Sequence, residues 1–498
     1  MIAKLWQRAS ARVCLWRRGS TIGVATSLTL MLTVFLPFVT IWSTQAAAPI
    51  PIGMPTHFSL GLANGPGGET WMKNSGVPWD ARYQYLAGGA NTGRGWATWN
   101  TNGDFAIYYM RASAGADTLP VFTYYQLLQS APSSGSSEGE RNYNNLNNAA
   151  TMKAYYADFK LLMDKILAFG KPVVVHVEPD LFGYMQHRVV NSTNSAASVP
   201  AAVASSGHSE TQGLPDTFQG FNWALLRLRD RYAPNAIMAM HISAWTTGID
   251  IGSNSDPNVD VLGEAQKVVA FHNTVGLAGN PTGLSSYDLI FFDPLDRDAA
   301  FYEYQYGDRS RWWDESNQRF PNFNRYHAYV KAITTEANRR AMFWQVPIGN
   351  TKYRSVNNTW NHYQDNRVQY WLGGYPTDGH LQALADAGVI GILFGRGADG
   401  PTTYDDAAGD GVTNPAPING NDRVAEYSDD DGGFLRLAAG QYYQAGAYQF
   451  GSGGIPTSTA TSVATATQTV APVPTATQRS GQVESLTIYL PLVLDQGR

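Results

Sequence analysis

The stretch KPVVVHVEPD, residues 171–180, is the clearest strand signal in this sequence. Its central residues, Val173 to Val177, are all valine or histidine, a composition typical of a strand that is covered on both faces. Strands of this kind belong to parallel sheets, whose carboxyl ends gather at one edge. Two acidic residues, Glu178 and Asp180, follow the run and would lie at that edge.

The same pattern repeats along the chain, where short apolar runs alternate with amphipathic segments. The clearest helical segment, residues 149–170, has apolar side chains three and four apart and ends at a glycine. Eight strand–helix units predict an α/β fold, a (β/α)8 TIM-type barrel with long loops at its C-terminal face. The other seven predicted strands are 57–63, 82–88, 119–126, 236–245, 287–294, 341–349 and 389–397.

A doubly wound open sheet is the structural alternative. It would usually carry a glycine-rich phosphate turn after its first strand and an acidic residue ending its second. Residues 61–69 are glycine-rich, but no acidic residue ends the second run at 83–91. The sequence therefore favours the barrel and does not indicate nucleotide binding.

Both ends of the chain differ in composition from its middle. Residues 1–48 combine a basic start, an apolar run and small residues, which predicts a signal peptide; an uncleaved membrane anchor is the alternative. A barrel domain is expected at 49–450, followed by a Thr/Pro/Ala-rich linker at 451–482. The apolar tail at 483–498 is either a surface-attachment signal or a docking strand. We expect a secreted or cell-surface protein with no stable membrane insertion after cleavage.

Charge and cysteine content exclude several classes of function. Removing residues 1–48 takes away five basic residues and no acidic one, which lowers the formal net charge from −5 to −10. Such a chain is a poor nucleic-acid binder. The single cysteine, Cys14, lies within the predicted signal peptide, so a mature chain would have no disulfide or thiol chemistry.

The predicted strand ends carry the candidate catalytic groups. Glu178 is the candidate general acid, Asp293 the candidate base or nucleophile, and Asp180 a neighbour that tunes Glu178. Since side chains alternate along a strand, Glu178 and His176 are expected to point together into the barrel mouth, with His176 able to hydrogen-bond the carboxylate. A core histidine and a simple helix cap are the structural alternatives for these two residues.

Aromatic and uncharged polar side chains cluster at the same predicted face, which suits a neutral polysaccharide or oligosaccharide. The stretch from Gln345 to Gly374 is dense in Asn, Gln, Tyr and Arg. The candidate substrate-binding residues are His176, His241, Trp245, Trp344, Gln345, Arg396, Tyr124 and Trp71.

Signals for metals and other nucleophiles are few. The sequence has no HExxH motif, so a catalytic zinc site is not expected, and it has no G-x-S-x-G elbow for an esterase. We expect no cofactor. Two acidic segments, 404–423 and 428–433, could bind a structural Ca²⁺, or they could be turn-rich loops.

With these features the sequence resembles the secreted (β/α)8-barrel glycoside hydrolases over about residues 56–450. Glu178-Pro179 is similar to the acid/base position of retaining cellulase-type enzymes, but Val177 replaces their asparagine and Gln345 stands where they carry a nucleophilic glutamate. VEPD at 177–180 and DPLDRD at 293–298 resemble two motifs of family 6 cellulases, in reversed order. That resemblance implies inversion and draws attention to Asp180 and Asp293.

The expected function is therefore hydrolysis of glycosidic bonds by carboxyl general acid/base catalysis. A non-catalytic carbohydrate-binding barrel on the cell surface is the alternative, which the missing glutamate on the seventh strand favours. A structural surface protein displayed on the linker is a third interpretation.

Overall fold

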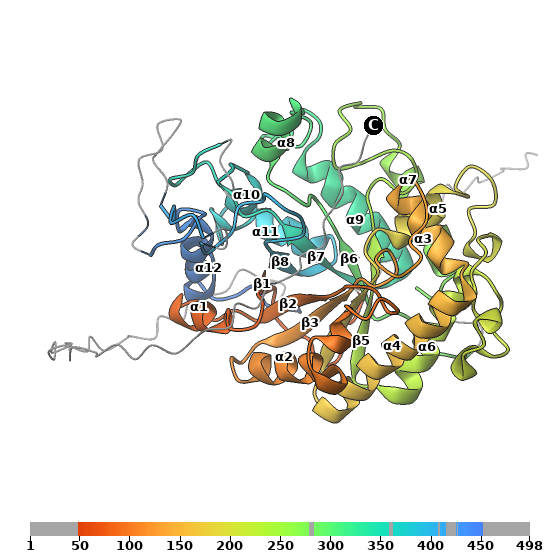
Figure 1. Ribbon diagram of the computed structural model, residues 1–498. Helices are drawn as coiled ribbons and strands as arrows, with labels where there is room; N and C mark the ends of the chain where they lie inside the picture. The colour runs from red at the N-terminus through yellow and green to blue at the C-terminus, as the bar shows by residue number, and fades with distance from the viewer. Residues whose placement is uncertain are drawn as a thin grey trace, which may run out of the picture. The chain divides into compact units, whose positions relative to one another are not determined.

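The chain forms a closed barrel of eight parallel strands, in the order β1 to β8 (Figure 1). The computed structural model describes residues 48–277, 283–357, 362–406, 409–414, 425 and 427–451. The predicted (β/α)8 barrel is confirmed, and each strand overlaps the run predicted for it. The strands are β1 (Ser59–Ala63), β2 (Ala81–Leu86), β3 (Leu119–Tyr124), β4 (Val173–Val177), β5 (Ala236–Ile242), β6 (Leu289–Phe292), β7 (Arg340–Val346) and β8 (Val389–Phe394).

Helices connect the strands and cover the barrel on its outside (Figure 1). α4 (Ala149–Phe169) shows how the sequence sets their limits: the Asn148 side chain accepts a hydrogen bond from the Thr151 N–H at its start, and Gly170 ends it with a positive φ of 74°. The other α-helices are α1 (Glu69–Asn74), α2 (Asp104–Ala114), α3 (Glu138–Leu146), α5 (Leu181–His187), α6 (Phe218–Tyr232), α7 (Val261–Asn273), α8 (Ala299–Tyr306), α9 (Phe323–Ala337), α10 (Arg367–Leu372), α11 (His380–Asp386) and α12 (Phe434–Gln444).

The apolar core has two layers, and β4 contributes to both. Val174 faces the barrel interior, where it packs with residues such as Phe291 and Trp344. Val173, Val175 and Val177 face outward and pack in the layer between strands and helices. All five residues of β4 are buried, as a strand covered on both faces requires.

The strand ends set where the site can form. His176 of β4 is level with Thr123 of β3 and Ala239 of β5, and Ile242 of β5 is level with Phe292 of β6. The loops after β3, β4, β5 and β6 therefore start side by side at one end of the barrel.

Several predictions concern parts of the chain outside the described residues. They are the signal peptide at 1–48, the linker and the C-terminal tail, so the expectations about export and surface attachment stay predictions. Among the residues that the structure describes, no helix has the length and apolar character needed to cross a membrane.

Candidate functional site

The chain turns sharply where β4 ends, and this turn separates Glu178 from His176. Glu178 has a φ of 40° and Asp180 a φ of 66°, both in the left-handed region that non-glycine residues rarely adopt. The positive φ at 178 breaks the in–out alternation of the strand. The expectation that Glu178 points into the barrel mouth above His176 is therefore wrong.

The Glu178 carboxylate instead faces the layer between the barrel and α4. Its Oε1 accepts hydrogen bonds from the backbone N–H of Gln126 at 3.0 Å and of Leu127 at 3.1 Å, and the Tyr155 hydroxyl of α4 faces it. Only 1% of the residue is exposed. Burial raises the pKa of Glu178 to about 8, although the two backbone donors and Tyr155 act in the opposite direction.

Asp180, two residues later, directly precedes α5 and is less buried than Glu178. It is partly exposed, and the Ser243 hydroxyl after β5 donates to its Oδ1 over a long 3.4 Å. Burial of its carboxyl group, followed by the charges of Glu138 and Asp296, raises the pKa of Asp180 to about 8. Asp180 therefore favours its protonated form more than an ordinary aspartate does.

Asp293 follows β6 and lies near enough to Asp180 for the two charges to interact. Burial, together with the charges of Asp296 and Asp180, raises its pKa well above the ordinary range of an aspartate. The Gln345 side chain donates from Nε2 to Asp293 Oδ2 at 3.2 Å, and its Oε1 accepts the Tyr85 hydroxyl at 2.7 Å. This second bond orients the amide so that its N–H group faces Asp293.

The Gln345 side chain can reach Asp293 because β7 is irregular near its C-terminal end. The strand shifts register between Phe343 and Val346, and Gln345 has a positive φ of 56°. Gly397 lies against the side-chain amide so closely that a Cβ atom there would be 1.1 Å from Gln345 Oε1. Backbone strain at Gln345, Glu178 and Asp180 is thus concentrated at this end of the barrel.

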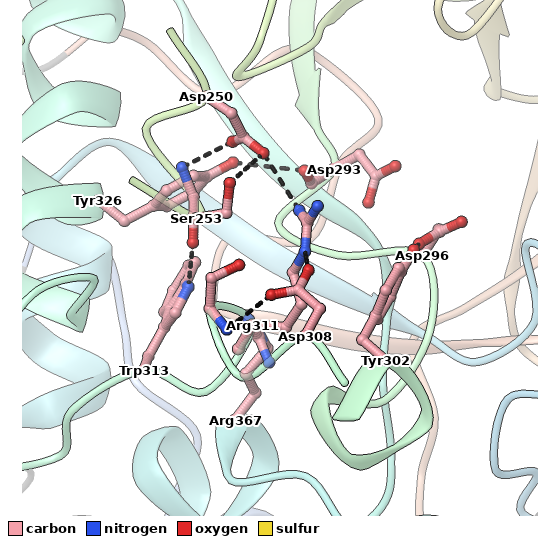
Figure 2. Close-up of polar contacts among 12 residues, drawn as sticks. Asp250, Ser253, Asp293, Asp296, Tyr302, Asp308, Arg311, Trp313, Tyr326 and Arg367 are labelled. Atoms are coloured by element: carbon pink, nitrogen blue, oxygen red, sulfur yellow. Dashed lines mark hydrogen bonds and ion pairs between the residues drawn. The ribbon is translucent and has the colours of Figure 1, made fainter. Parts of the chain in front are cut away.

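Asp296 is the member of the group that is paired with a cation. Its Oδ2 lies 2.5 Å from Arg297, and its Oδ1 accepts the Tyr302 hydroxyl. Figure 2 shows Arg311 between Asp250 and Asp308, to which it donates at 3.1 and 3.0 Å. The Arg311 guanidinium lies 4.9 Å from the Tyr302 ring centre, so this network also supports the tyrosine that binds Asp296.

Glu138, in the first turn of α3, is the fourth acid of the group. Its Oε1 accepts the Tyr125 hydroxyl at 2.9 Å, and burial raises its pKa. The sequence did not indicate Glu138 as a site residue, because a serine followed by acidic residues, as at Ser137, is the usual pattern of a helix start. We call Glu138, Asp180, Asp293 and Asp296 the carboxyl cluster.

The predicted substrate-binding residues His176, His241 and Trp344 lie inside the barrel. His176 Nε2 is 3.0 Å from His241 Nδ1, and the His176 ring packs 4.7 Å from that of Trp344. Burial lowers the pKa of His241 to about 3, and it also lowers the pKa of His176 well below the ordinary value of a histidine. Both histidines are therefore neutral core residues, and the expected hydrogen bond between His176 and Glu178 is not formed.

Tyr124 also differs from its predicted position. Its side chain points outward and donates to Asp158 of α4 at 2.6 Å, and it is fully buried. The remaining predicted contacts, Trp245, Arg396 and Trp71, are partly exposed. The Trp245 ring packs 4.9 Å from that of Tyr184, and Trp71 packs 4.5 Å from Tyr404.

In the acidic segment 428–433, two aspartates accept hydrogen bonds from the protein. Asp430 Oδ2 accepts the Thr403 hydroxyl at 2.6 Å, and Asp431 accepts the N–H groups of Gly433 and Leu435 at the start of α12. Within the described ranges, no group of three acidic, histidine or cysteine side chains could hold a metal ion. Most of the other acidic segment, 404–423, falls outside those ranges, so a structural Ca²⁺ stays a prediction.

The fold and the site thus define a (β/α)8 barrel with a carboxyl cluster at the C-terminal ends of its strands. The sequence matches no family model and no curated protein. Comparison with solved structures finds other barrels. The GH53 catalytic domain of Ignisphaera aggregans is 10% identical over 70% of this chain and 87% of its own, with a TM-score of 0.36.

Two further solved structures are similar at the same level. A modular endo-β-1,4-mannanase of Cellulomonas fimi, from a study of glycoside hydrolase family 26, is 11% identical over 78% of this chain and 70% of its own, with a TM-score of 0.39. A psychrophilic family 10 endo-β-1,4-xylanase is 10% identical over 68% of this chain and 86% of its own, with a TM-score of 0.36. Likeness at this level adds nothing to the barrel topology of the chain itself. The resemblance to family 6 cellulases stays a prediction.

Proposed function

We propose that this chain is a glycoside hydrolase that acts on a neutral polysaccharide by carboxyl general acid/base catalysis. One observation supports the proposal above all: Asp180 after β4 and Asp293 after β6 follow parallel strands at the end of the barrel where its loops gather, and the charge of Asp180 raises the pKa of Asp293. Glycoside hydrolysis needs two carboxyl groups, one protonated and one ionised.

The hydrogen bonds favour a definite division of roles between these two acids. Neighbouring carboxyl groups cannot all ionise, so the pair shares its protons. The amide N–H of Gln345 stabilises the ionised form of Asp293, whereas Asp180 receives only the long Ser243 contact. On the ground of these hydrogen bonds we assign Asp180 as the proton donor and Asp293 as the carboxylate, within a pair whose pKa values are both raised by burial.

In the reaction, Asp180 gives its proton to the glycosidic oxygen as the bond from that oxygen to the anomeric carbon breaks. Asp293 either removes a proton from the attacking water or attacks the anomeric carbon itself, and the distance across the substrate decides between these two outcomes. Asp296, which forms an ion pair with Arg297, is the member of the cluster that we assign to stabilising the developing oxocarbenium ion. Glu178, which the sequence suggested as the acid, instead anchors a loop.

Of the predicted binding groups that remain partly exposed, we assign Trp245 and Arg396 to substrate binding. An aromatic ring can stack on a pyranose face, and a guanidinium can donate to hydroxyl groups. The basic and apolar start of the sequence supports export, so we propose a secreted or cell-surface enzyme that meets its polymer outside the cell.

Reducing-sugar release from β-1,4-glucan, β-1,4-mannan and β-1,4-xylan tests the proposal. We expect the wild-type chain to act on at least one of these polymers, and Asp180→Asn and Asp293→Asn to lose about 10²- to 10⁴-fold in rate with no fall in Tm. Full activity of either variant would overturn the assignment.

A carbohydrate-binding barrel without activity is the second candidate, because Gln345 and not an acid ends β7. Affinity electrophoresis in gels that contain the same polymers distinguishes it. Retardation of the wild-type chain with no product from any polymer would favour binding alone.

A further inference from the structure

The Glu178 carboxylate is the link between β4 and the loop that follows β3. Its Oε1 binds two successive N–H groups, those of Gln126 and Leu127, and its Oε2 lies 3.3 Å from the second. A buried carboxylate that accepts adjacent backbone donors fixes the path of the chain as well as its position.

The same loop is held from its other side by Asn145 of α3. Its side-chain amide donates to the carbonyl groups of Leu127 at 2.7 Å and Ser130 at 2.8 Å. Glu178 therefore satisfies the N–H groups of this segment, while Asn145 satisfies its carbonyl groups. The two anchors tie the β3 loop to β4 and to α3, the helix that carries Glu138.

Tyr125 is the residue directly before the anchored pair. Its N–H donates to the Leu86 carbonyl at 2.9 Å, and its hydroxyl donates to Glu138. Glu138 is in turn the charged neighbour with the largest effect on Asp180. A path thus runs from Glu178 through the loop backbone to Tyr125 and Glu138. Gly139, the next residue of α3, packs on Tyr184 of α5, the helix that Asp180 directly precedes, so the start of α3 lies against this part of the chain.

We propose that Glu178 is a positioning residue, which holds the β3 loop so that the Tyr125–Glu138 pair stands beside Asp180. This inference rests on the proposed function only for its catalytic consequence, since the placement of Glu138 beside Asp180 can be measured without any substrate. The reacting carboxyl groups stay Asp180 and Asp293.

The groups that face the two ends of this path are different. Three acids face Asp180: Glu138 from α3, and Asp293 and Asp296 after β6. Three hydroxyl groups also face it, those of Ser243 after β5, Tyr85 of β2 and Tyr125 after β3. Glu178 is faced by Tyr155 and Asp158 from α4 and by Tyr124 from β3.

If the Glu138 charge is lost from the vicinity of Asp180, the pKa of Asp180 should shift in a definite direction. A neighbouring negative charge disfavours the ionised form of Asp180 and so raises its pKa. Removing that charge, or letting it move away, lowers the pKa of Asp180. Glu138→Gln and Glu178→Ala should therefore shift the titration of Asp180 in the same direction, by about one pH unit.

The experiment is a ¹³C NMR titration of the chain labelled at aspartate Cγ, with the Asp180 signal assigned by its absence from Asp180→Asn. We expect the Asp180 midpoint to fall in Glu178→Ala and in Glu138→Gln, and the double variant to fall no further than either. Glu178→Gln keeps one acceptor oxygen for the two N–H groups and should restore the wild-type midpoint.

Asp158→Asn is the matched control, because Asp158 is a buried acid in the same layer that binds Trp96 and Tyr124 and not the β3 loop. It should leave the Asp180 midpoint unchanged. If Glu178→Ala does not fold, Tyr125→Phe breaks the same path at its hydroxyl and should show the same shift.

Two results would overturn the inference. One is an Asp180 midpoint that falls in Glu138→Gln but in neither Glu178→Ala nor Tyr125→Phe. The other is a Glu178→Gln chain with a wild-type Asp180 titration and no hydrolysis, because Glu178 would then react directly. A wild-type chain inactive on every polymer would contradict the proposed function and leave the titration result standing.

Discussion

Gln345 donates its side-chain N–H to Asp293 at 3.2 Å, from a position in β7 where the backbone φ is positive. Burial raises the pKa of both Asp293 and Asp180, and this bond acts against the rise at Asp293, which supports the proposed role of Asp293 as the carboxylate. Gln345→Glu replaces the donor by a further carboxyl group of equal size. We expect kcat/KM to fall about 10- to 100-fold, as the loss of a hydrogen bond to a charged group implies.

The same substitution should move the acidic limb of the pH–rate profile upward, because a negative neighbour disfavours ionised Asp293. Gln345→Met, similar in size but without the donor, is the control for packing. A Gln345→Glu enzyme with a wild-type profile would contradict the role assigned to this bond.

The pH dependence of the wild-type enzyme follows from the two roles. The donor Asp180 has a pKa raised to about 8, so activity should decline as the pH rises through about 8. Asp293 must be ionised, so activity should also decline on the acidic side. Initial rates between pH 4 and 10 should give a bell-shaped curve, and its alkaline limb should disappear in Asp180→Asn with whatever activity remains.

Folding stability should depend on pH with the opposite sign from an ordinary carboxylate. Asp180 and Glu178 bind protons more tightly in the folded chain than in the unfolded one, since both have a pKa raised to about 8. Their contribution is fully present below the unfolded pKa values and is lost as the pH rises through about 8. Thermal unfolding at pH 5 and pH 8 should show that Asp180→Asn gains Tm relative to the wild-type chain at pH 8 more than at pH 5.

Trp245 offers a test of substrate binding that leaves the acids intact. Its ring is partly exposed and follows Ser243, which contacts Asp180. We expect Trp245→Ala to raise KM for the polymer about 10-fold with a smaller effect on kcat, and Trp245→Phe to recover most of the loss. Trp344→Phe, inside the barrel, should change stability instead of KM.

The barrel could be predicted from the sequence because a strand that is buried on both faces consists almost entirely of apolar residues, and such a run can be recognised in the sequence alone. Val173 to Val177 predicted such a strand, and its neighbours followed by the same pattern. It also named Asp180 and Asp293, since acids after parallel strands gather at one end of a barrel.

The orientation of Glu178 could not be predicted in this way. The alternation rule assumes extended backbone, and the positive φ at 178 reverses the side chain within one residue. Glu138 was missed for another reason: it lies in a helix after a long loop, so no strand pattern locates it. The sequence predicted His176 and His241 as substrate-binding groups at the barrel mouth, whereas the structure places both deeper, in the barrel interior.

The most direct test of the central claim compares Asp180→Asn with Glu178→Gln on two substrates: the polymer that the wild-type chain cleaves best, and a 2,4-dinitrophenyl glycoside of the same sugar, whose leaving group needs no proton. We predict that Asp180→Asn loses about 10²- to 10⁴-fold on the polymer and far less on the aryl glycoside. Glu178→Gln should change both rates by a similar, small factor. The opposite pattern, with the selective loss in Glu178→Gln, would contradict the account.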